Sequence, residues 1–318
     1  MQLPLSLQQA LENMARKVPL NSLRDAYQQL SEAYHRGENS LASFHQPNHI
    51  LAYLLARMPA TYAAVYQALE SIKRRLPDWT CKRLIDLGAG PGTASWAAAE
   101  VFDELESIVL FEQSQQMLTA GKTLASDAEK DVLRKSEWFL QNLQSPLSLP
   151  QADLAIFSYV CAEIDCLDLI IRLWKQKMMV LIVEPGTPKG FANILSIRNQ
   201  LLELGAHIAA PCPHHLACPT ASWCHFPARV ERTKVHKLLK EGSLGYEDEK
   251  YSYVALSPFP CPSLEGRIVE KPQKLSGHVK LSVCTNRGTL EQKVVTKKQK
   301  EVYREARDAE WGSELKCF

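Results

Sequence analysis

The chain has 318 residues, 46% of them hydrophobic and 23% charged, with a formal net charge of +2. These values are typical of a folded globular protein of one or two domains, and they exclude an intrinsically disordered or collagen-like chain. No apolar run of about 20 residues predicts a membrane-spanning helix, and residues 1–20 lack the basic segment and apolar core of a secretory signal. We therefore expect a cytoplasmic protein whose nine cysteines are reduced thiols or metal ligands.

Residues 1–78 are predicted to form a helical N-terminal domain, with helix over most of 5–76. Ser6 is the expected N-cap of the first helix, because Gln9 follows it at capping-box spacing. Apolar residues from Ile50 to Met58 recur at helical spacing. Pro59 is expected to interrupt this helix before it resumes at residues 60–75.

From residue 79 to residue 262, short apolar strands alternate with helices, which predicts a doubly wound, mostly parallel sheet of the Rossmann-like α/β class. The predicted strands cover 83–87, 107–111, 137–140, 152–158, 178–183 and 250–256, and the predicted helices cover 93–101, 117–125, 167–175 and 190–204. Residues 263–318 form a basic C-terminal segment. Within it, strands at 279–284 and 292–296 flank a turn at Asn286–Gly288, which predicts a β-hairpin.

A glycine-rich loop, Asp86-Leu87-Gly88-Ala89-Gly90-Pro91-Gly92, follows the first strand and opens a helix. Glycines let the backbone approach a nucleotide closely, and a helix N-terminus offers free N–H donors. Glu112, about 20 residues on, is placed to bind ribose hydroxyls. Thr93 stands where a dinucleotide fingerprint needs glycine or alanine, so the loop favours S-adenosylmethionine over a dinucleotide. The expected cofactor contacts are Asp86, Gly88, Gly90, Gly92, Glu112 and Asn142.

The loop after the fourth strand, Ser158-Tyr159-Val160-Cys161-Ala162-Glu163, is where a transferred methyl group would lie. It lacks the Asn/Asp-Pro-Pro-aromatic motif of amino-methylating enzymes. Tyr159 and Glu163 are the candidate catalytic residues, as groups that could orient a substrate. Cys161 is more simply explained as a small buried residue than as a nucleophile.

Cys212, Cys218 and Cys224 are spaced C-x5-C-x5-C in a proline-rich stretch, and Cys284 lies 60 residues beyond the third. Four thiolates suit either an iron–sulfur cluster or zinc. The paired C-x2-C knuckles of zinc sites and the C-x3-C-x2-C run of radical enzymes are both absent. Cys261 is a rival fourth ligand, and three histidines could substitute as zinc ligands: His214, His215 and His225.

Residues 267–300 hold nine Lys or Arg against two Glu, a net charge of +7 in an otherwise slightly acidic chain. Such a segment suits a polyanion, and phosphate contacts would make binding dependent on salt. The candidate RNA-binding residues are Lys293, Lys297, Lys298 and Lys300.

These motifs together resemble the methyltransferase-like family of small-ribosomal-subunit proteins, which act as assembly factors in mitochondria and have bacterial homologues. The resemblance is carried by residues 53–62, 86–92, 183–188, 212–226, 246–253, 279–288 and 303–312. It implies a class I methyltransferase fold, a [4Fe–4S] cluster on Cys212, Cys218, Cys224 and Cys284, S-adenosylmethionine at the glycine loop, and binding to small-subunit rRNA. The implied function is RNA methylation during ribosome assembly. The alternative is a non-catalytic assembly factor in which both cofactors are structural. Off the ribosome we expect a monomer.

Overall fold

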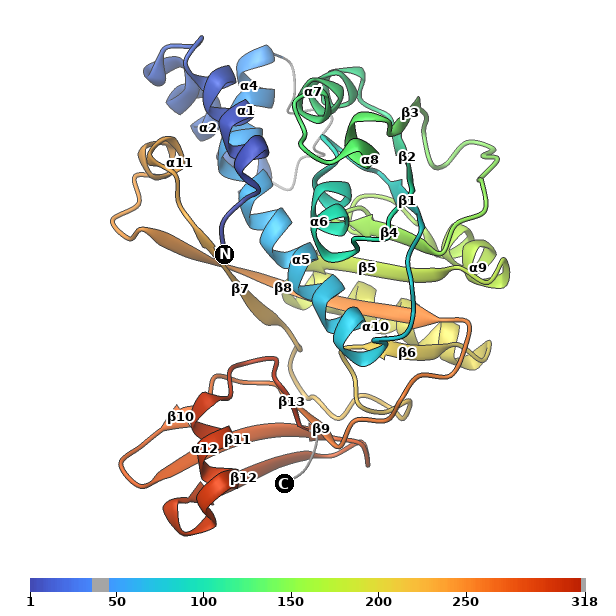
Figure 1. Cartoon of the computed structure of the whole chain (residues 1–318), viewed down its shortest axis with the longest axis vertical. Coiled ribbons are helices and arrows are strands. Elements are labelled where there is room, and N and C mark those ends of the chain that lie inside the picture. Colours follow the sequence, from blue (N-terminus) through green and yellow to red (C-terminus); the bar gives the residue numbers. More distant parts are fainter. Residues whose placement is uncertain (36–45, 316–318) are drawn as a thin grey trace.

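The computed structural model describes residues 1–35 and 46–315. Its centre is an eight-stranded sheet with the strand order β3-β2-β1-β4-β5-β8-β6, in which β7 also pairs with β8 (Figure 1). The strands are β1 (Arg83–Leu87), β2 (Ser107–Glu112), β3 (Glu137–Leu140), β4 (Leu154–Ser158), β5 (Met179–Pro185), β6 (His207–Ala210), β7 (Phe226–Glu231) and β8 (Tyr246–Ser257). The first five are parallel to one another. This arrangement confirms the predicted doubly wound fold of a class I methyltransferase.

Helices cover both faces of the sheet because successive side chains of its central strands point to opposite sides. Leu84 of β1 packs in one core with α5 and α6, whereas Ile85 packs in the other with α9 and α10. The helices of this part of the chain are α6 (Thr93–Val101), α7 (Gln115–Ser126), α8 (Asp131–Arg134), α9 (Leu167–Lys175), α10 (Pro188–Glu203) and α11 (Lys234–Leu239). Residues 179–183 of β5 are fully buried, as a strand between two helical layers requires.

The strand β8 is antiparallel to β5, β6 and β7, and it separates β5 from β6. The sequence predicts only its second half, residues 250–256. Neither β6 nor β7 is predicted, because β6 has four residues and β7 contains Pro227. The alternating burial of Phe226, Ala228 and Val230 along β7 is the pattern that could have identified it.

The N-terminal helices are α1 (Leu5–Ala15), α2 (Leu20–His35), α4 (Pro47–Ala56) and α5 (Met58–Arg75). Part of the predicted helical stretch, residues 36–45, lies outside the described residues. The prediction that Ser6 caps the first helix was wrong. Helix α1 begins directly after Pro4, and Ser6 is buried in its first turn. Pro59 lies in the first turn of α5, where a missing N–H costs no intrahelical hydrogen bond.

The C-terminal segment forms a second, five-stranded sheet with the order β10-β11-β9-β13 and β12 paired with β11. Its elements are β9 (Gly266–Ile268), β10 (Gln273–Lys274), β11 (His278–Thr285), β12 (Leu290–Thr296), the 3₁₀ turn η1 (Lys297–Gln299), α12 (Lys300–Asp308) and β13 (Glu314–Leu315). The predicted hairpin is confirmed, since β11 and β12 are antiparallel neighbours. Within residues 1–35 and 46–315, no helix combines the length and apolarity needed to cross a membrane.

Candidate functional site

The glycine loop connects β1 to α6 with a backbone that only glycine adopts easily. Gly88, Gly90 and Gly92 have φ angles of +70°, +55° and +80°, in the left-handed region that is disfavoured for residues with a β-carbon. A β-carbon added at Gly88 would lie 2.6 Å from Val160 Cγ2, whereas one added at Gly90 would meet no atom within 4 Å. The loop therefore packs tightly on its Gly88 side and is open at Gly90.

Two carboxylates organise this loop from the ends of β1 and β2. Glu112 Oε2 accepts a hydrogen bond from Gly90 N–H at 2.8 Å, and its Oε1 accepts one from Ser114 N–H at 2.6 Å. Asp86 Oδ2 accepts from the Ser95 N–H and hydroxyl at 3.1 and 2.8 Å. Asp86 Oδ1 is buried and has no partner among the described residues. Burial raises the pKa of Asp86 to about 7.

Replacing Asp86 with asparagine is expected to remove a pH dependence of stability. An unfolded aspartate has a pKa of about 4, so between that pH and about 7 the unfolded chain releases a proton that the native state retains. This group therefore lowers the free energy of unfolding as pH rises through that window. Asp86→Asn should gain stability relative to the parent at pH 8 but not at pH 4, as measured by urea unfolding. An equal effect at both pH values would contradict the assignment.

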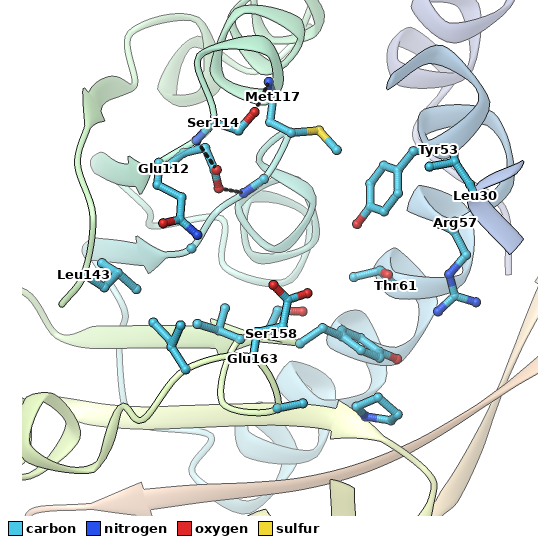
Figure 2. Close-up of a pocket in the computed structure, with 18 of the residues that line it drawn as sticks. Leu30, Tyr53, Arg57, Thr61, Glu112, Ser114, Met117, Leu143, Ser158 and Glu163 are labelled. Atoms are coloured by element: carbon cyan, nitrogen blue, oxygen red, sulfur yellow. Dashed lines mark hydrogen bonds between the residues drawn. The ribbon is translucent and has the colours of Figure 1, made fainter. Parts of the chain in front are cut away.

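A cavity of about 630 Å³ lies above the glycine loop, enclosed by the carboxyl ends of the parallel strands and by the N-terminal helices. In Figure 2, Glu112, Ser114 and Met117 face it from one side, and Tyr53, Arg57 and Thr61 face it from the other. Four expected cofactor or catalytic contacts line it besides Gly88, namely Gly90, Glu112, Tyr159 and Glu163. Asp86 and Gly92 lie in the loop beneath. Asn142 is not in the lining, where its neighbours Gln141 and Leu143 are found instead.

Tyr159 directly follows β4 and has a φ of +61°, a strained conformation for a residue with a side chain. Its hydroxyl donates to Glu249 Oε1 at 3.0 Å, and Arg57 Nη2 lies 3.3 Å from the same oxygen. Arg57 lies at the junction of α4 and α5 and Glu249 lies on β8, both outside the glycine loop in sequence. Sequence reasoning missed both, and the only available signal was their position within the segments that carry the family resemblance.

The loop after β4 is held from below by Glu184, which is fully buried at the end of β5. Its Oε1 accepts the Cys161 N–H at 3.0 Å, and burial raises its pKa to about 7. A hydrogen bond with Cys166, followed by burial, raises the pKa of the Cys161 thiol well above its usual value. A thiol held protonated is a poor nucleophile, which supports a structural role for Cys161, although the residue is half-buried and not buried as predicted.

The cysteine stretch lies between β6 and β7, and the four candidate ligands meet at one small cavity of about 40 Å³. The residues concerned are Cys212, Cys218, Cys224 and Cys284. Burial, followed by the proximity of Cys212 and Cys218, raises the pKa of Cys284 to about 12. His214 also lines this cavity, with its Nε2 3.4 Å from Cys284 Sγ. Cys261 does not line it. Among the described residues, no three or more His, Cys, Asp or Glu side chains are arranged so that they could hold a metal ion.

Three buried arginines hold the backbone of the cysteine stretch from three different elements. Arg75 of α5 donates to Cys212 O at 3.0 Å. Arg198 of α10 donates to His214 O and Leu216 O at 3.2 and 2.7 Å. Arg267 of β9 donates to Pro211 O at 3.0 Å. Arg267 is also ion-paired with Glu314. The bonds of Arg75 and Arg198 to the cysteine stretch go to neutral carbonyls, so these two place buried positive charge near the four thiols.

The candidate RNA-binding lysines lie at one end of the C-terminal sheet. Lys297 and Lys298 are exposed on η1, and Lys300 is exposed at the start of α12. Lys293 is half-buried on β12. Three of the four predicted residues are therefore brought together at the surface, and the fourth lies beside them on the preceding strand.

Comparison with known proteins gives a family and several relatives. The model of a family described as "Mitochondrial small ribosomal subunit Rsm22" matches residues 47–316. The human protein named "Ribosome assembly protein METTL17, mitochondrial" is 26% identical over 291 aligned positions, covering 83% of this chain and 62% of the relative. The Schizosaccharomyces pombe "Rsm22-cox11 tandem protein 1, mitochondrial" is 27% identical over 326 positions, covering 83% of this chain and 42% of the relative. The chain thus spans about two fifths to three fifths of the relatives' lengths.

Solved structures give distant likenesses. The plantazolicin methyltransferase BpumL in complex with SAH is 7% identical with a TM-score of 0.42, covering 80% of this chain and 99% of that protein. The ribosomal protein L11 methylase from Lactobacillus delbrueckii subsp. bulgaricus is 14% identical with a TM-score of 0.35, covering 60% of this chain and 76% of that protein.

Proposed function

This chain belongs to the mitochondrial small ribosomal subunit Rsm22 family, and we propose on that premise that it binds S-adenosylmethionine and small-subunit rRNA during ribosome assembly. We further propose that it methylates the RNA. The observation that carries the proposal is the large cavity above the open side of Gly90, beside a buried glutamate. We also propose that the protein acts in the bacterial cytoplasm and is a monomer when it is not bound to the ribosome. Its proposed domains are residues 1–78, 79–262 and 263–318.

The chemistry of the cavity lining fits S-adenosylmethionine. Gly90 leaves room for a ligand against its backbone, and Glu112 keeps acceptor lone pairs that ribose hydroxyls can use. Gly88, Gly92 and Asp86 would shape the loop that carries these contacts. Asn142, which follows β3, would add a further contact to the donor. The donor supplies a methyl group on a sulfonium, so the protein's task is alignment. Tyr159 and Glu163, in the loop after β4, line the cavity and would orient an acceptor.

We propose that the C-terminal sheet binds rRNA phosphates through Lys293, Lys297, Lys298 and Lys300. Three of these side chains are exposed, and the whole segment from 267 to 300 carries a net charge of +7. Contacts of this kind release counterions, so affinity falls as salt rises.

Changing Lys297, Lys298 and Lys300 together to alanine is expected to weaken binding to small-subunit rRNA and to flatten its salt dependence. Each phosphate contact contributes about 0.7 to 0.9 to the slope of log affinity against log salt, so the loss of three should lower the slope by about 2 or more. The measurement is fluorescence anisotropy between 50 and 300 mM KCl. An unchanged slope in the variant would rule out these lysines as phosphate contacts.

We also propose a [4Fe–4S] cluster on Cys212, Cys218, Cys224 and Cys284, with zinc as the alternative metal. The four thiols line one cavity, and the nearby arginines Arg75 and Arg198 would balance part of the negative charge of a thiolate-bound cluster. The side chains would have to rearrange around it, because no three ligand side chains of the described residues are now arranged to hold a metal ion. Burial raises the pKa of the Cys218, Cys224 and Cys284 thiols, which favours their protonated forms, and metal binding would reverse this.

Replacing Cys284 with serine is expected to remove iron and sulfide together from protein purified without oxygen. The proposed cluster needs all four cysteine ligands, and Cys284 is the one of the four that comes from the C-terminal sheet. The matched control is Cys261→Ser, since Cys261 lies outside the cavity lining and should leave iron and sulfide unchanged. Iron and sulfide assays with an absorption spectrum decide the question. If the parent protein contains zinc and no sulfide, the site is a zinc site and the proposed cluster is wrong.

A second candidate is a non-catalytic assembly factor that uses S-adenosylmethionine as a structural ligand. The observation that favours it is the hydrogen bond of the Tyr159 hydroxyl to Glu249, which also pairs with Arg57, because a hydroxyl engaged in this way is not free to act on a substrate. Methyl transfer from radiolabelled donor to immature small subunits separates the two candidates. Labelled rRNA supports the enzyme, and its absence with every assembly intermediate, while donor and RNA both bind, supports the structural role.

A further inference from the structure

The junction between α2 and α11 forms a second hollow, of about 500 Å³, far from the C-terminal sheet. Figure 1 shows α11 at the outer end of the β7–β8 ribbon, next to α2. Three cations line the hollow against one acid: Arg24, Lys234 and Lys237 with Glu241. The remaining lining is Leu238 and Gly242. A positive hollow of this composition suits an anionic group such as a phosphodiester.

These cations are held by a fixed scaffold. Arg24 Nε donates to Leu238 O at 3.3 Å, which ties α2 to α11. Beneath α11, Lys240 donates to Glu247 of β8 at 2.8 Å, and the buried His236 lies 3.4 Å from the same carboxylate. Because the buried face of α11 is anchored, the helix holds the backbone of its exposed residues Lys234 and Lys237 in a defined position.

The hollow adjoins the mouth of the large cavity through α2. Tyr27, Leu30 and Ser31 of this helix line the cavity, and Arg24 lies one turn before Tyr27. Residues three apart share a helix face and differ by about 4.5 Å along the axis. That step is shorter than the span of one nucleotide, so a single nucleotide is long enough to reach from beside Arg24 to beside Tyr27.

The cavity wall nearest α2 has the composition of a base-binding surface. Tyr53 and Arg57 project into the cavity from α4 and the α4–α5 junction, opposite the glycine-loop side (Figure 2). Tyr159 faces the same space, and Glu249 holds both it and Arg57 in place. Aromatic rings and a guanidinium plane stack on unpaired bases, which is the usual mode of recognising single-stranded RNA.

We propose that single-stranded RNA enters the site across the α2–α11 junction, with a phosphate in the hollow and an unstacked base against Tyr53 and Arg57. This inference rests on the proposed RNA-binding function and deepens it, since it gives the substrate class and its path to the cavity. It adds a second contact region to the C-terminal lysines, towards the other end of the molecule in Figure 1.

The test compares two triple variants of the full chain that remove the same charges. Arg24→Ala/Lys234→Ala/Lys237→Ala empties the hollow of cations, and Lys122→Ala/Arg172→Ala/Lys175→Ala removes exposed cations of α7 and α9. Binding to a 12-nucleotide single-stranded RNA is measured over a salt series. The hollow variant should lower the salt slope by about 2, at about 0.7 per contact on a single strand, and the α7–α9 variant should not change it. Tyr53→Leu should weaken binding about tenfold by loss of stacking with the slope unchanged.

The outcomes separate this inference from the function on which it rests. If the C-terminal lysine variant loses rRNA binding while the hollow variant and Tyr53→Leu bind the oligonucleotide as the parent does, the entry path is wrong and the proposed function stands. If the parent binds neither RNA, the proposed function fails. If the hollow variant loses binding only to phosphatidylserine vesicles, the hollow is a membrane contact and the inference is overturned. Circular dichroism of each variant checks that it is folded.

Discussion

Replacing Arg267 with alanine is expected to lower the free energy of unfolding by about 3–5 kcal/mol, the usual cost of leaving one partner of a buried ion pair unpaired. The Arg267 side chain is 2% exposed, and its Nη2 lies 3.0 Å from Glu314 Oε1, whose side chain is 8% exposed. The guanidinium also donates to Pro211 O, Gly312 O and Ser71 Oγ. One side chain thus joins the cysteine stretch, the C-terminal tail and α5.

The measurement is urea unfolding at 25 °C, with two comparison variants. In Arg267→Met/Glu314→Leu no charge is left unpaired, so part of the lost stability should return. Arg229→Ala breaks a two-point pair with Asp248 in which both side chains are exposed, 57% and 39%, and its effect should be much smaller. If Arg267→Ala lowers the free energy of unfolding no more than Arg229→Ala does, Arg267 does not stabilise the contact between these three segments.

Replacing Gly90 with leucine is expected to weaken S-adenosylmethionine binding by at least about 100-fold, which is about 2.7 kcal/mol. The added side chain would enter the space above the loop that the donor needs, since nothing lies within 4 Å of its first carbon. The φ of +55° adds a backbone penalty of about 1–2 kcal/mol. Isothermal titration calorimetry measures the affinity.

Gly205→Leu is the matched control for the backbone penalty. Gly205 has a φ of +93°, and an added β-carbon there would also meet no atom within 4 Å, but it lies in the turn after α10. This variant should lose stability and keep the parent's affinity for the donor. Donor binding by Gly90→Leu at the parent's affinity would show that S-adenosylmethionine does not occupy this cavity.

The sequence predicts the parts of the fold that local patterns determine. The bounds of the first strand, the helix after the glycine loop, the third strand and α9 agree with the structure, because apolar runs and loop glycines mark them directly. The glycine loop is predictable for the same reason, since its backbone chemistry is local.

Contacts between distant segments were not predictable from local patterns. The antiparallel insertion of β8 between β5 and β6 depends on a pairing partner that no short window contains. Arg57 and Glu249 meet across 192 positions, and Arg267 joins Ser71 across 196. In the sequence, Arg57, Glu249 and Arg267 each look like an ordinary charged surface residue. Asn142 stays a prediction: it follows β3 as expected, but its two neighbours and not Asn142 itself line the cavity.

The strand order also determines the order in which strands can pair while the chain is being synthesised. Strand β6 pairs only with β8 within the described residues, and β8 ends at Ser257, 47 positions after β6 ends at Ala210. A growing chain emerges from the ribosome at about 5–20 residues per second, so β6 and the open edge of β5 wait several seconds for their partner. Cys212, Cys218 and Cys224 emerge during that interval, and Cys284 follows later still. The nascent protein therefore exposes three thiols and an unpaired sheet edge before it can close either site, and this is the stage at which chaperones have most to protect.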